Sequence, residues 1–353
     1  MRKMRQSVVE GKRIFIGLED SKKTWRVNVR YNGMEVHQAS MPSDYGDLKG
    51  YLANRFPGCD ITVMYEAGFK GFDLHDRLVA DGIRCVVTPP NKVTQAKDTR
   101  VKTDTRDARR LAKNLENGDY VACHIPDRER CEDREVSRAH EQVKKDIART
   151  KNRIRGLLKF HGIEGCRSKG AWSDREYLSV VNMDVPRSIK FSIRIKVKHL
   201  TVLFELRNEL RKELRELSCK ERYRVAVKAK KSVPGIGWLT AIRLTLEWGD
   251  MSRFASGKHI ASFSGLTACE YSTGDTQHRG RITGQSAEFV RSWLIECAWR
   301  AIKKDPVLFD KFHRVWQNSG SKKKAIVAVA RKLAVRMRAL EVNNNTYQIG
   351  LIA

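Results

Sequence analysis

The chain has 353 residues, of which 41% are hydrophobic, so it is long enough for two domains with a substantial core. Its 69 Lys and Arg residues against 41 Asp and Glu give a formal net charge of +28, which excludes an ordinary enzyme of balanced charge and indicates a polyanionic partner, most simply nucleic acid. No apolar run approaches the roughly 20 residues of a membrane-spanning helix, and the eight scattered cysteines form no CxxC pair. We therefore expect a cytoplasmic protein without a membrane partner, a zinc site or disulfide bonds.

The first 125 residues alternate between strand and helix patterns. Asn32-Gly33 separates two alternating runs and is a strong hairpin signal. Strand patterns cover residues 13–18, 25–31, 34–39, 60–65 and 83–88, and helical patterns cover residues 47–56, 71–81 and a run that starts at 104. A hairpin and a third strand, followed by alternating helices and strands, predict an α/β fold with a ribonuclease-H-like (RuvC-like) mixed sheet.

Acidic residues follow the predicted strands and begin the next helix. Glu19 and Asp20 end the first strand, Glu66 ends the fourth, and Asp104 and Asp107 lie one helical turn apart. Sites in open α/β sheets collect at strand ends, so these segments predict a carboxylate cluster around two divalent ions, an arrangement that cleaves phosphodiesters. A regular strand points Glu19 and Asp20 to opposite faces, so only one of them can face this site. The alternatives are helix capping for the two aspartates and a solvated strand end for Glu66.

Two long helical patterns follow. Residues 127–161 carry apolar residues at coiled-coil spacing, and leucines in residues 203–217 repeat near every 3.5 residues. After an irregular connection at residues 162–185, the second helix is expected to pair with the first as an antiparallel hairpin. The basic face of the first helix is either a solvated spacer or a surface for nucleic-acid backbone on a dimerising arm. Its candidate binding residues are Lys144, Lys145, Arg149 and Arg153.

The C-terminal part begins with residues 232–237, SVPGIG, which predict either a helix-hairpin-helix or a plain tight turn. Gly235 and Gly237 would let a phosphate approach the backbone there. A later loop carries Ser272 and Thr273, a hydroxyl pair that is ordinarily a turn feature and otherwise a candidate nucleophile. The other candidate nucleic-acid contacts are Arg279, Arg281 and Arg291 and, at the start of a basic helix over residues 321–340, Lys322, Lys323 and Lys324. A loose tail is expected from residue 343.

Five segments together resemble one protein family. They are residues 17–22 (GLEDSK), 65–68 (YEAG), 102–112 (KTDTRDARRLA), 232–237 (SVPGIG) and 263–283 (FSGLTACEYSTGDTQHRGRIT). Each is weak alone, but their order and spacing are similar to those of bacterial insertion-sequence transposases. These join an N-terminal DEDD, RuvC-like domain to a C-terminal domain with a nucleophilic serine, and they are recombinases guided by a non-coding bridge or seek RNA.

The resemblance implies roles for particular residues. Glu19, Glu66, Asp104 and Asp107 would hold Mg²⁺ (or Mn²⁺), and Ser272 would attack DNA to form a transient phosphoserine link. Two positions depart from the family pattern. Glu19 stands where the family usually has Asp, which leaves Asp20 open as the first metal ligand. Thr273 stands directly before the glycine, where the family usually has serine, which leaves Thr273 open as the nucleophile.

The resemblance also implies partners and an organisation. The partners are target and donor DNA and a guide non-coding RNA, with the protein acting at the nucleoid. Because two strand exchanges need more than one active site and the long helices offer a dimer surface, we also expect a dimer or tetramer. The alternative functions are a metal-dependent endonuclease of the Holliday-junction-resolving type and a non-catalytic nucleic-acid-binding protein. The expected parts are a RuvC-like DEDD metal-binding domain (residues 1–125), a long-helix coiled-coil or linker region (126–228), a mainly helical, serine-bearing transposase domain (229–342) and a tail (343–353).

Overall fold

The computed structural model of the chain describes residues 11–90, 103–164, 172–270, 279–283 and 288–350. The chain divides into two compact units, Met1–Ile125 and Pro126–Ala353, each of which is described by itself. No helix of the described residues is long and apolar enough to cross a membrane.

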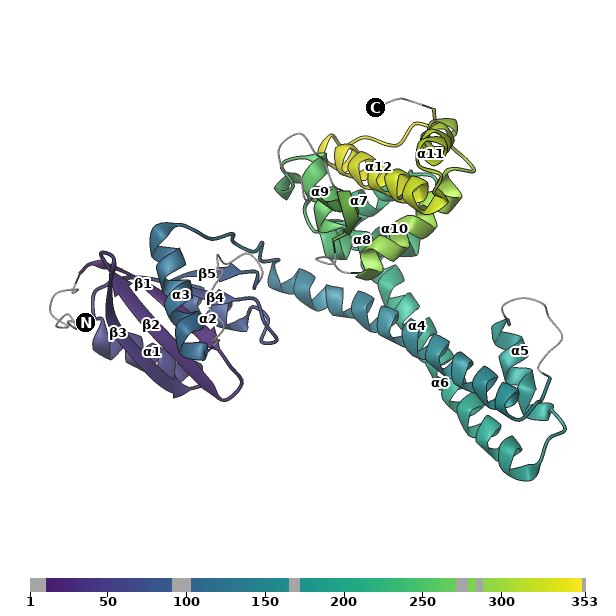
Figure 1. Ribbon diagram of the computed structural model, residues 1–353, viewed down its shortest axis with the longest axis horizontal. Helices are drawn as coiled ribbons and strands as arrows, with labels where there is room; N and C mark the ends of the chain where they lie inside the picture. The colour runs from purple at the N-terminus through teal and green to yellow at the C-terminus, as the bar shows by residue number, and fades with distance from the viewer. Residues whose placement is uncertain (1–10, 91–102, 165–171, 271–278, 284–287, 351–353) are drawn as a thin grey trace. The chain divides into compact units, whose positions relative to one another are not determined.

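The first unit is built on a five-stranded mixed sheet (Figure 1). The strands, in the spatial order β3-β2-β1-β4-β5, are β3 (Met34–Pro42), β2 (Thr24–Tyr31), β1 (Arg13–Asp20), β4 (Asp60–Glu66) and β5 (Arg84–Thr88). Strands β1 to β3 are antiparallel, whereas β4 runs parallel to β1 and to β5. The predicted hairpin turn is present, because Asn32 and Gly33 both have positive φ, the conformation of a type I′ turn. This arrangement is compatible with a ribonuclease-H-like DEDD domain.

Helices cover both faces of this sheet. The helices of the unit are α1 (Tyr45–Arg55), α2 (Asp73–Ala80) and α3 (Asp104–Asn117). Ile14, Ile16 and Leu18 of β1 belong to the larger core, which includes buried residues of α1 and α2. Phe15 of β1 points to the other face and packs with residues of α3, since side chains alternate along a strand.

Gly17 sets how closely α3 approaches the sheet. A Cβ atom at Gly17 would lie 2.1 Å from the carbonyl oxygen of Ala108 and 2.3 Å from the amide nitrogen of Ala112, both in the backbone of α3. Real Cβ atoms do not come that close to a backbone, so any side chain at this position would push α3 away. The first turn of α3, which carries two of the predicted acids, is therefore placed by a glycine on β1.

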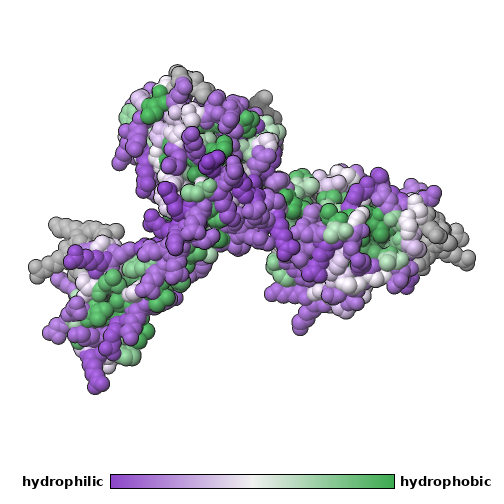
Figure 2. Space-filling model, turned by 180° about the vertical axis from the view of Figure 1, so that it is seen from behind, coloured by the Kyte–Doolittle hydropathy of each residue, from purple (hydrophilic) through white to green (hydrophobic). Residues whose placement is uncertain are grey.

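The second unit begins with two long helices that pack along each other (Figure 1). They are α4 (Arg128–Phe160) and α6 (Arg187–Cys219), and α5 (Asp174–Ser179) lies between them in sequence; we call these three helices the arm. The arm has its own core, in which Ile147 and Ile154 of α4 pack with Ile193 and Leu200 of α6. Helix α6 starts at Arg187, directly after the connection expected at residues 162–185, and includes the leucine repeat of residues 203–217. On the face shown in Figure 2, hydrophilic side chains cover most of the surface, and apolar side chains also reach it along the arm.

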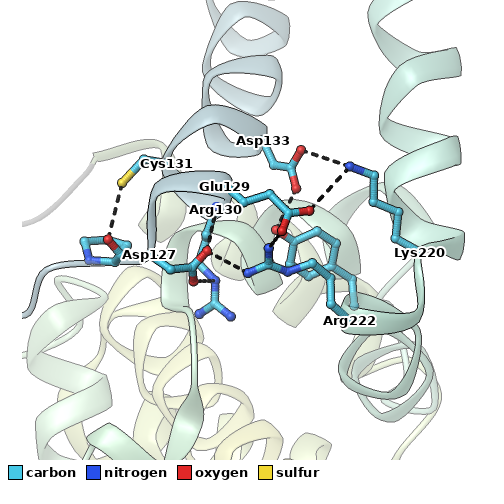
Figure 3. A network of polar contacts seen from close by, with 9 residues as sticks. Asp127, Glu129, Arg130, Cys131, Asp133, Lys220 and Arg222 are labelled. Atoms are coloured by element: carbon cyan, nitrogen blue, oxygen red, sulfur yellow. Dashed lines mark hydrogen bonds and ion pairs between the residues drawn. The ribbon is translucent and has the colours of Figure 1, made fainter.

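Ion pairs fix the base of the arm, where the start of α4 meets the junction of α6 with α7 (Figure 3). The guanidinium of Arg222 pairs with Glu129 and, at 2.8 Å, with Asp127. Lys220 lies 3.4 Å from a carboxylate oxygen of Asp133, whose other oxygen accepts a 2.7 Å hydrogen bond from Tyr223. The first turns of α4 are thus held by residues more than 80 positions later in the chain.

The rest of the second unit is mainly helical and shares one core. Its elements are α7 (Glu221–Lys231), α8 (Trp238–Trp248), α9 (Gly257–Phe263), β6 (Ala268–Glu270), β7 (Arg279–Ile282), α10 (Glu288–Ala301), α11 (Pro306–Ser319) and α12 (Lys322–Val342). The predicted loose tail is wrong at Tyr347. Its amide donates to the hydroxyl of Ser232 over 2.9 Å, and its own hydroxyl bonds to Asp305 and Arg336. The tail is held at Tyr347 because residues distant in sequence provide hydrogen-bond partners for both its backbone and its side chain.

Candidate active site: a carboxylate cluster at the end of the sheet

Two of the predicted acids end neighbouring parallel strands. Strands β1 and β4 pair with Leu18 beside Tyr65, so that Glu19 and Glu66 follow side by side at the strand ends. Residues two positions earlier in each strand, Gly17 and Met64, contact α3 or pack in its core. Because side chains alternate, Glu19 and Glu66 share this face of the sheet with α3.

The other two predicted acids lie in the first turn of α3. Thr103 caps this helix by accepting a hydrogen bond from the amide of Arg106, and Asp104 and Asp107 follow it. Asp107 is buried, with 7% of its surface exposed, whereas Asp104 is exposed. The helix N-terminus favours negative charge, which offsets part of the repulsion between these carboxylates.

The pKa of Glu19 reflects both its burial and the other acids around it. It is raised from its ordinary value of 4.5 to about 7, first by burial and then by the negative charges of Glu66, Asp107, Asp20 and Asp104. Such a shift is typical of a place where a protein brings several carboxylates together. Three separate segments of the first unit, β1, β4 and α3, therefore bring four acids to one place.

Asp20 lies on the opposite side of the sheet from this face. It alternates with Glu19 and follows Ile16 and Leu18, which point into the larger core. Asp20 is 8% exposed, and its Oδ2 is buried without a hydrogen-bond partner among the described residues. Burial is the first cause that raises its pKa to about 6, while the charge of Lys70 acts in the other direction. The strand thus turns Glu19, not Asp20, towards α3.

One basic residue lies within the cluster. Arg110, one turn after Asp107 on α3, donates from Nη2 to Glu66 Oε1 over 2.9 Å and lies 3.2 Å from Asp107 Oδ1. In addition, the hydroxyl of Ser21 donates to Asp104 over 3.4 Å. Arg110 is not among the site residues predicted from the sequence. Its signal is a basic residue three positions after an acid on the same helical face, which the motif KTDTRDARRLA contains.

The donor set fits a hard divalent cation. Carboxylate oxygens are the ligands that Mg²⁺ and Mn²⁺ prefer, and the raised pKa of Glu19 shows that positive charge would be favourable here. Among the described residues, no group of three or more His, Cys, Asp or Glu side chains is already arranged to hold a metal ion. Instead, Arg110 bonds two of the four acids, so a cation at the cluster would compete with its guanidinium.

The predicted nucleophiles, Ser272 and Thr273, lie outside the described residues. In sequence they fall between β6 and β7, which pair antiparallel with Ala268 beside Ile282. The side chain of Arg279 is not described either. Arg281 on β7 is exposed and Arg291 on α10 is partly buried.

The candidate nucleic-acid residues of the helices are exposed. They are Lys144, Lys145, Arg149 and Arg153 on α4, and Lys322, Lys323 and Lys324 in the first turn of α12. Several of them have intramolecular partners: Arg149 lies 3.0 Å from Asp146, and the ammonium of Lys322 lies 4.5 Å from the centre of the Trp316 ring.

The two glycines between α7 and α8 differ. Gly235 has φ +84°, and a Cβ there would lie 2.6 Å from the carbonyl oxygen of Cys297 on α10. The absence of a side chain at Gly235 therefore lets α10 pack closely against it. Gly237 is exposed and has open space around it at the N-terminus of α8. A phosphate contact at Gly237 stays a prediction. At Gly235, the backbone of α10 occupies the space on one side, so a phosphate cannot approach from that side.

Comparison with known proteins finds similarity to transposases. A family model described as "Transposase IS116/IS110/IS902 family" matches residues 228–314, and a model of the DEDD transposases of IS110, described as "Transposase", matches residues 16–163. The putative transposase y4qE of Sinorhizobium fredii is 27% identical over 282 residues, which cover 79% of this chain and 68% of that protein. The transposase for insertion sequence element IS1533 of Leptospira borgpetersenii is 22% identical, covering 72% of this chain and 75% of the relative.

A shorter part of the chain is similar to a different kind of recombination protein. The pilin gene-inverting protein of Moraxella lacunata is 35% identical over 113 residues, covering 31% of this chain and 34% of that protein. The two family models together match the segment that carries all four acids and the segment that carries Ser272 and Thr273. The chain therefore belongs to the IS110/IS116 family of insertion-sequence transposases and is a DNA transposase or recombinase.

Proposed function

We propose that this transposase cuts and rejoins the DNA strands of an insertion sequence with a divalent cation, Mg²⁺ or Mn²⁺, held by Glu19, Glu66, Asp104 and Asp107. The observation that supports this most is the pKa of Glu19, raised to about 7 by burial and by the other acids of the cluster. When bound, the cation would neutralise the charge that develops on the phosphate oxygens. The side chain of Glu19 would hold a proton in the metal-free protein and release it as the cation binds.

The proposed nucleophile is Ser272, with Thr273 as the alternative. Its Oγ would form a bond to phosphorus while the bond from phosphorus to the leaving deoxyribose oxygen breaks, so the energy of the phosphodiester is kept for rejoining. Attack of a second strand's hydroxyl would then release the serine, without ATP. The exposed guanidinium of Arg281, close by in sequence, is suited to binding a phosphate in this region.

Guidance by a non-coding RNA and assembly as a dimer or tetramer complete the proposal. Both are supported by the resemblance to the family, and the net charge of +28 suits binding of nucleic-acid backbone. The comparisons favour this function over a Holliday-junction-resolving endonuclease, which would cut through metal-activated water and leave no protein–DNA bond. Trapping a covalent adduct therefore separates the two.

The test is an adduct assay with the full chain, its co-purified RNA and nicked target DNA in Mg²⁺. We expect Ser272→Ala to abolish both the covalent adduct and recombination while RNA binding is retained, and Thr273→Ala to leave both. Asp104→Ala should also abolish both. A matched control is Asp47→Ala, which removes an exposed acid from the first turn of α1 and should have no effect. Normal recombination by the Ser272→Ala, Thr273→Ala double variant would refute the serine mechanism.

A further inference from the structure

An exposed aromatic ring flanked by two ammonium groups lies beside the carboxylate cluster. Phe69, in the connection between β4 and α2, is 64% exposed. The Nζ atoms of Lys22 and Lys70 lie 5.6 Å and 5.9 Å from the centre of its ring. A single exposed aromatic residue is unremarkable on a protein surface, but a ring with two cations at this distance has the composition of a nucleotide-binding platform.

The platform is partly pre-ordered. Lys70 also lies over the ring of Trp25, with its Nζ 4.5 Å from the ring centre, and Trp25 on β2 is 97% buried, since only 3% of it is exposed. The ammonium of Lys70 is therefore held between a buried ring and an exposed one. Holding the cation in place beforehand lowers the entropy that binding would cost.

Short segments connect the platform to the acids. Phe69 follows Glu66 of the cluster by three residues. The intervening Gly68 lies near Asp20, whose side chain is on the other face of the sheet, since a Cβ built on Gly68 would lie 3.8 Å from both carboxylate oxygens of Asp20. Lys22 follows Ser21, whose hydroxyl donates to Asp104. The two segments that carry the platform are thus the same two that carry Glu19 and Glu66 to the ends of their strands.

The chemistry of this patch selects its ligand. The flat faces of the bases are covered in a duplex, so an exposed ring can stack only on an unpaired base. The two lysines are suited to the phosphates on either side of that base. An apolar protein surface would fit worse, because it would remove two ammonium groups from water without offering them partners.

We propose that Phe69, Lys22 and Lys70 bind an unpaired DNA base next to the phosphate that is held at the carboxylate cluster when it is cut. The choice of DNA rests on the function proposed above, since it follows from the nearness of the platform to Glu66 and Asp104. In this arrangement, stacking on Phe69 holds the melted strand so that the neighbouring phosphate lies at the acids.

The experiment uses full-length protein carrying Ser272→Ala and Thr273→Ala, in Mg²⁺, so that binding is measured without serine-dependent cutting. The DNA is a duplex with one unpaired 2-aminopurine beside the cleavage position, compared with the fully paired duplex. Stacking on an aromatic ring should quench the fluorescence of the unpaired 2-aminopurine. We expect Phe69→Ala to remove the quenching and to weaken binding of the unpaired site by roughly 5- to 100-fold, and Phe69→Trp to retain both.

Two further variants separate the parts of the platform. Lys22→Ala should keep the quenching and reduce the slope of log affinity against log salt concentration by about 0.7, the change for one single-strand phosphate. Phe160→Ala, at an 85% exposed aromatic residue at the end of α4, is the matched control and should change neither reading.

Failure of this inference can be told apart from failure of the proposed function. Unchanged quenching and affinity in Phe69→Ala would overturn the platform, and so would a loss seen with single-stranded RNA but not with the unpaired DNA. Cutting of the DNA by the serine- and threonine-free protein would instead overturn the proposed nucleophile, whatever the fluorescence shows. If the serine- and threonine-free protein quenches the 2-aminopurine fluorescence and the added Phe69→Ala change removes this quenching, the platform is supported independently of the adduct assay.

Discussion

Arg110 donates a hydrogen bond from Nη2 to Oε1 of Glu66 over 2.9 Å. The same nitrogen lies 3.2 Å from Asp107, so one internal cation holds two of the four acids that are proposed to bind metal. In the metal-free protein this guanidinium reduces the repulsion within the cluster. A divalent cation bound by the same carboxylates would compete with Arg110 for their negative charge.

We therefore predict that Arg110→Met raises the affinity for Mn²⁺ by about tenfold, the effect of about 1.4 kcal/mol of lost competition. The same change should lower the melting temperature of the metal-free protein, because the carboxylates lose a partner. Mn²⁺ titration followed by electron paramagnetic resonance, together with thermal unfolding in EDTA, measures both. Arg109→Met is the matched control, since the adjacent Arg109 is exposed and pairs with Glu35 instead. A weaker Mn²⁺ affinity in Arg110→Met would contradict the competition.

Metal binding should depend on pH through Glu19. Its folded-state pKa of about 7 lies above its ordinary value of 4.5, so between these values the folded protein holds a proton that the unfolded chain has lost. The stability of the metal-free protein should accordingly fall as pH rises from 4.5 to about 7 and then level off.

Because the cation replaces that proton, the affinity for Mn²⁺ should rise with pH up to about 7 and change little above it. Glu19→Gln has no such proton to lose, so its weaker binding should vary less between about pH 6 and pH 8. A pH profile that is identical in the wild-type protein and in Glu19→Gln would show that another group controls binding.

A buried ion pair joins α7 to the end of α12. Lys230 is fully buried and pairs with Glu341. Glu341→Leu would leave the ammonium without its partner and should reduce the free energy of unfolding by about 3–5 kcal/mol. The double variant Lys230→Met, Glu341→Leu should recover most of this loss, because an apolar pair removes the uncompensated charge. Denaturation in urea measures the difference, and a double variant less stable than Glu341→Leu would contradict this account.

The two glycines before α8 should respond differently to alanine. Gly235→Ala places a methyl group against the backbone of α10 at a positive φ, so it should destabilise the protein by more than about 1 kcal/mol. Gly237→Ala has room for its methyl group and should leave the melting temperature almost unchanged. If Gly237 contacts phosphate, Gly237→Ala should also weaken nucleic-acid binding at low salt, measured by fluorescence anisotropy. Equal stability of the two variants would show that Gly235 is not needed for packing.

Much of the first unit follows from the sequence, because strand alternation and the Asn32-Gly33 turn are local signals. The same alternation places Glu19, and not Asp20, on the face of the sheet that α3 covers. Arg110 shows the limit. The sequence shows that Arg110 lies on the same helical face as Asp107. Its hydrogen bond to Glu66, however, depends on how α3 packs across the sheet, and a single sequence does not predict that packing.

In the second unit, one local pattern fits two kinds of secondary structure. The start of α6 alternates apolar and basic residues from Ile193 to Val197, a pattern that suits a strand as well as a helix. Packing against α4 decides in favour of the helix, since Ile193, Val197 and Leu200 share one helical face and are all buried. The docking of Tyr347 likewise cannot be predicted from local sequence patterns, because its partners Ser232 and Asp305 are distant from it in the sequence.

Gly17 carries no functional group, yet the spacing of the acids depends on it. Any side chain there would force α3 outwards and carry Asp104 and Asp107 away from Glu19 and Glu66. In a random-mutagenesis screen for lost transposition, Gly17 should therefore appear among the null alleles although every acid is still encoded. The spacing of the acids proposed to bind metal is thus set by the smallest residue, at a position where the backbone of α3 leaves no room for a Cβ atom.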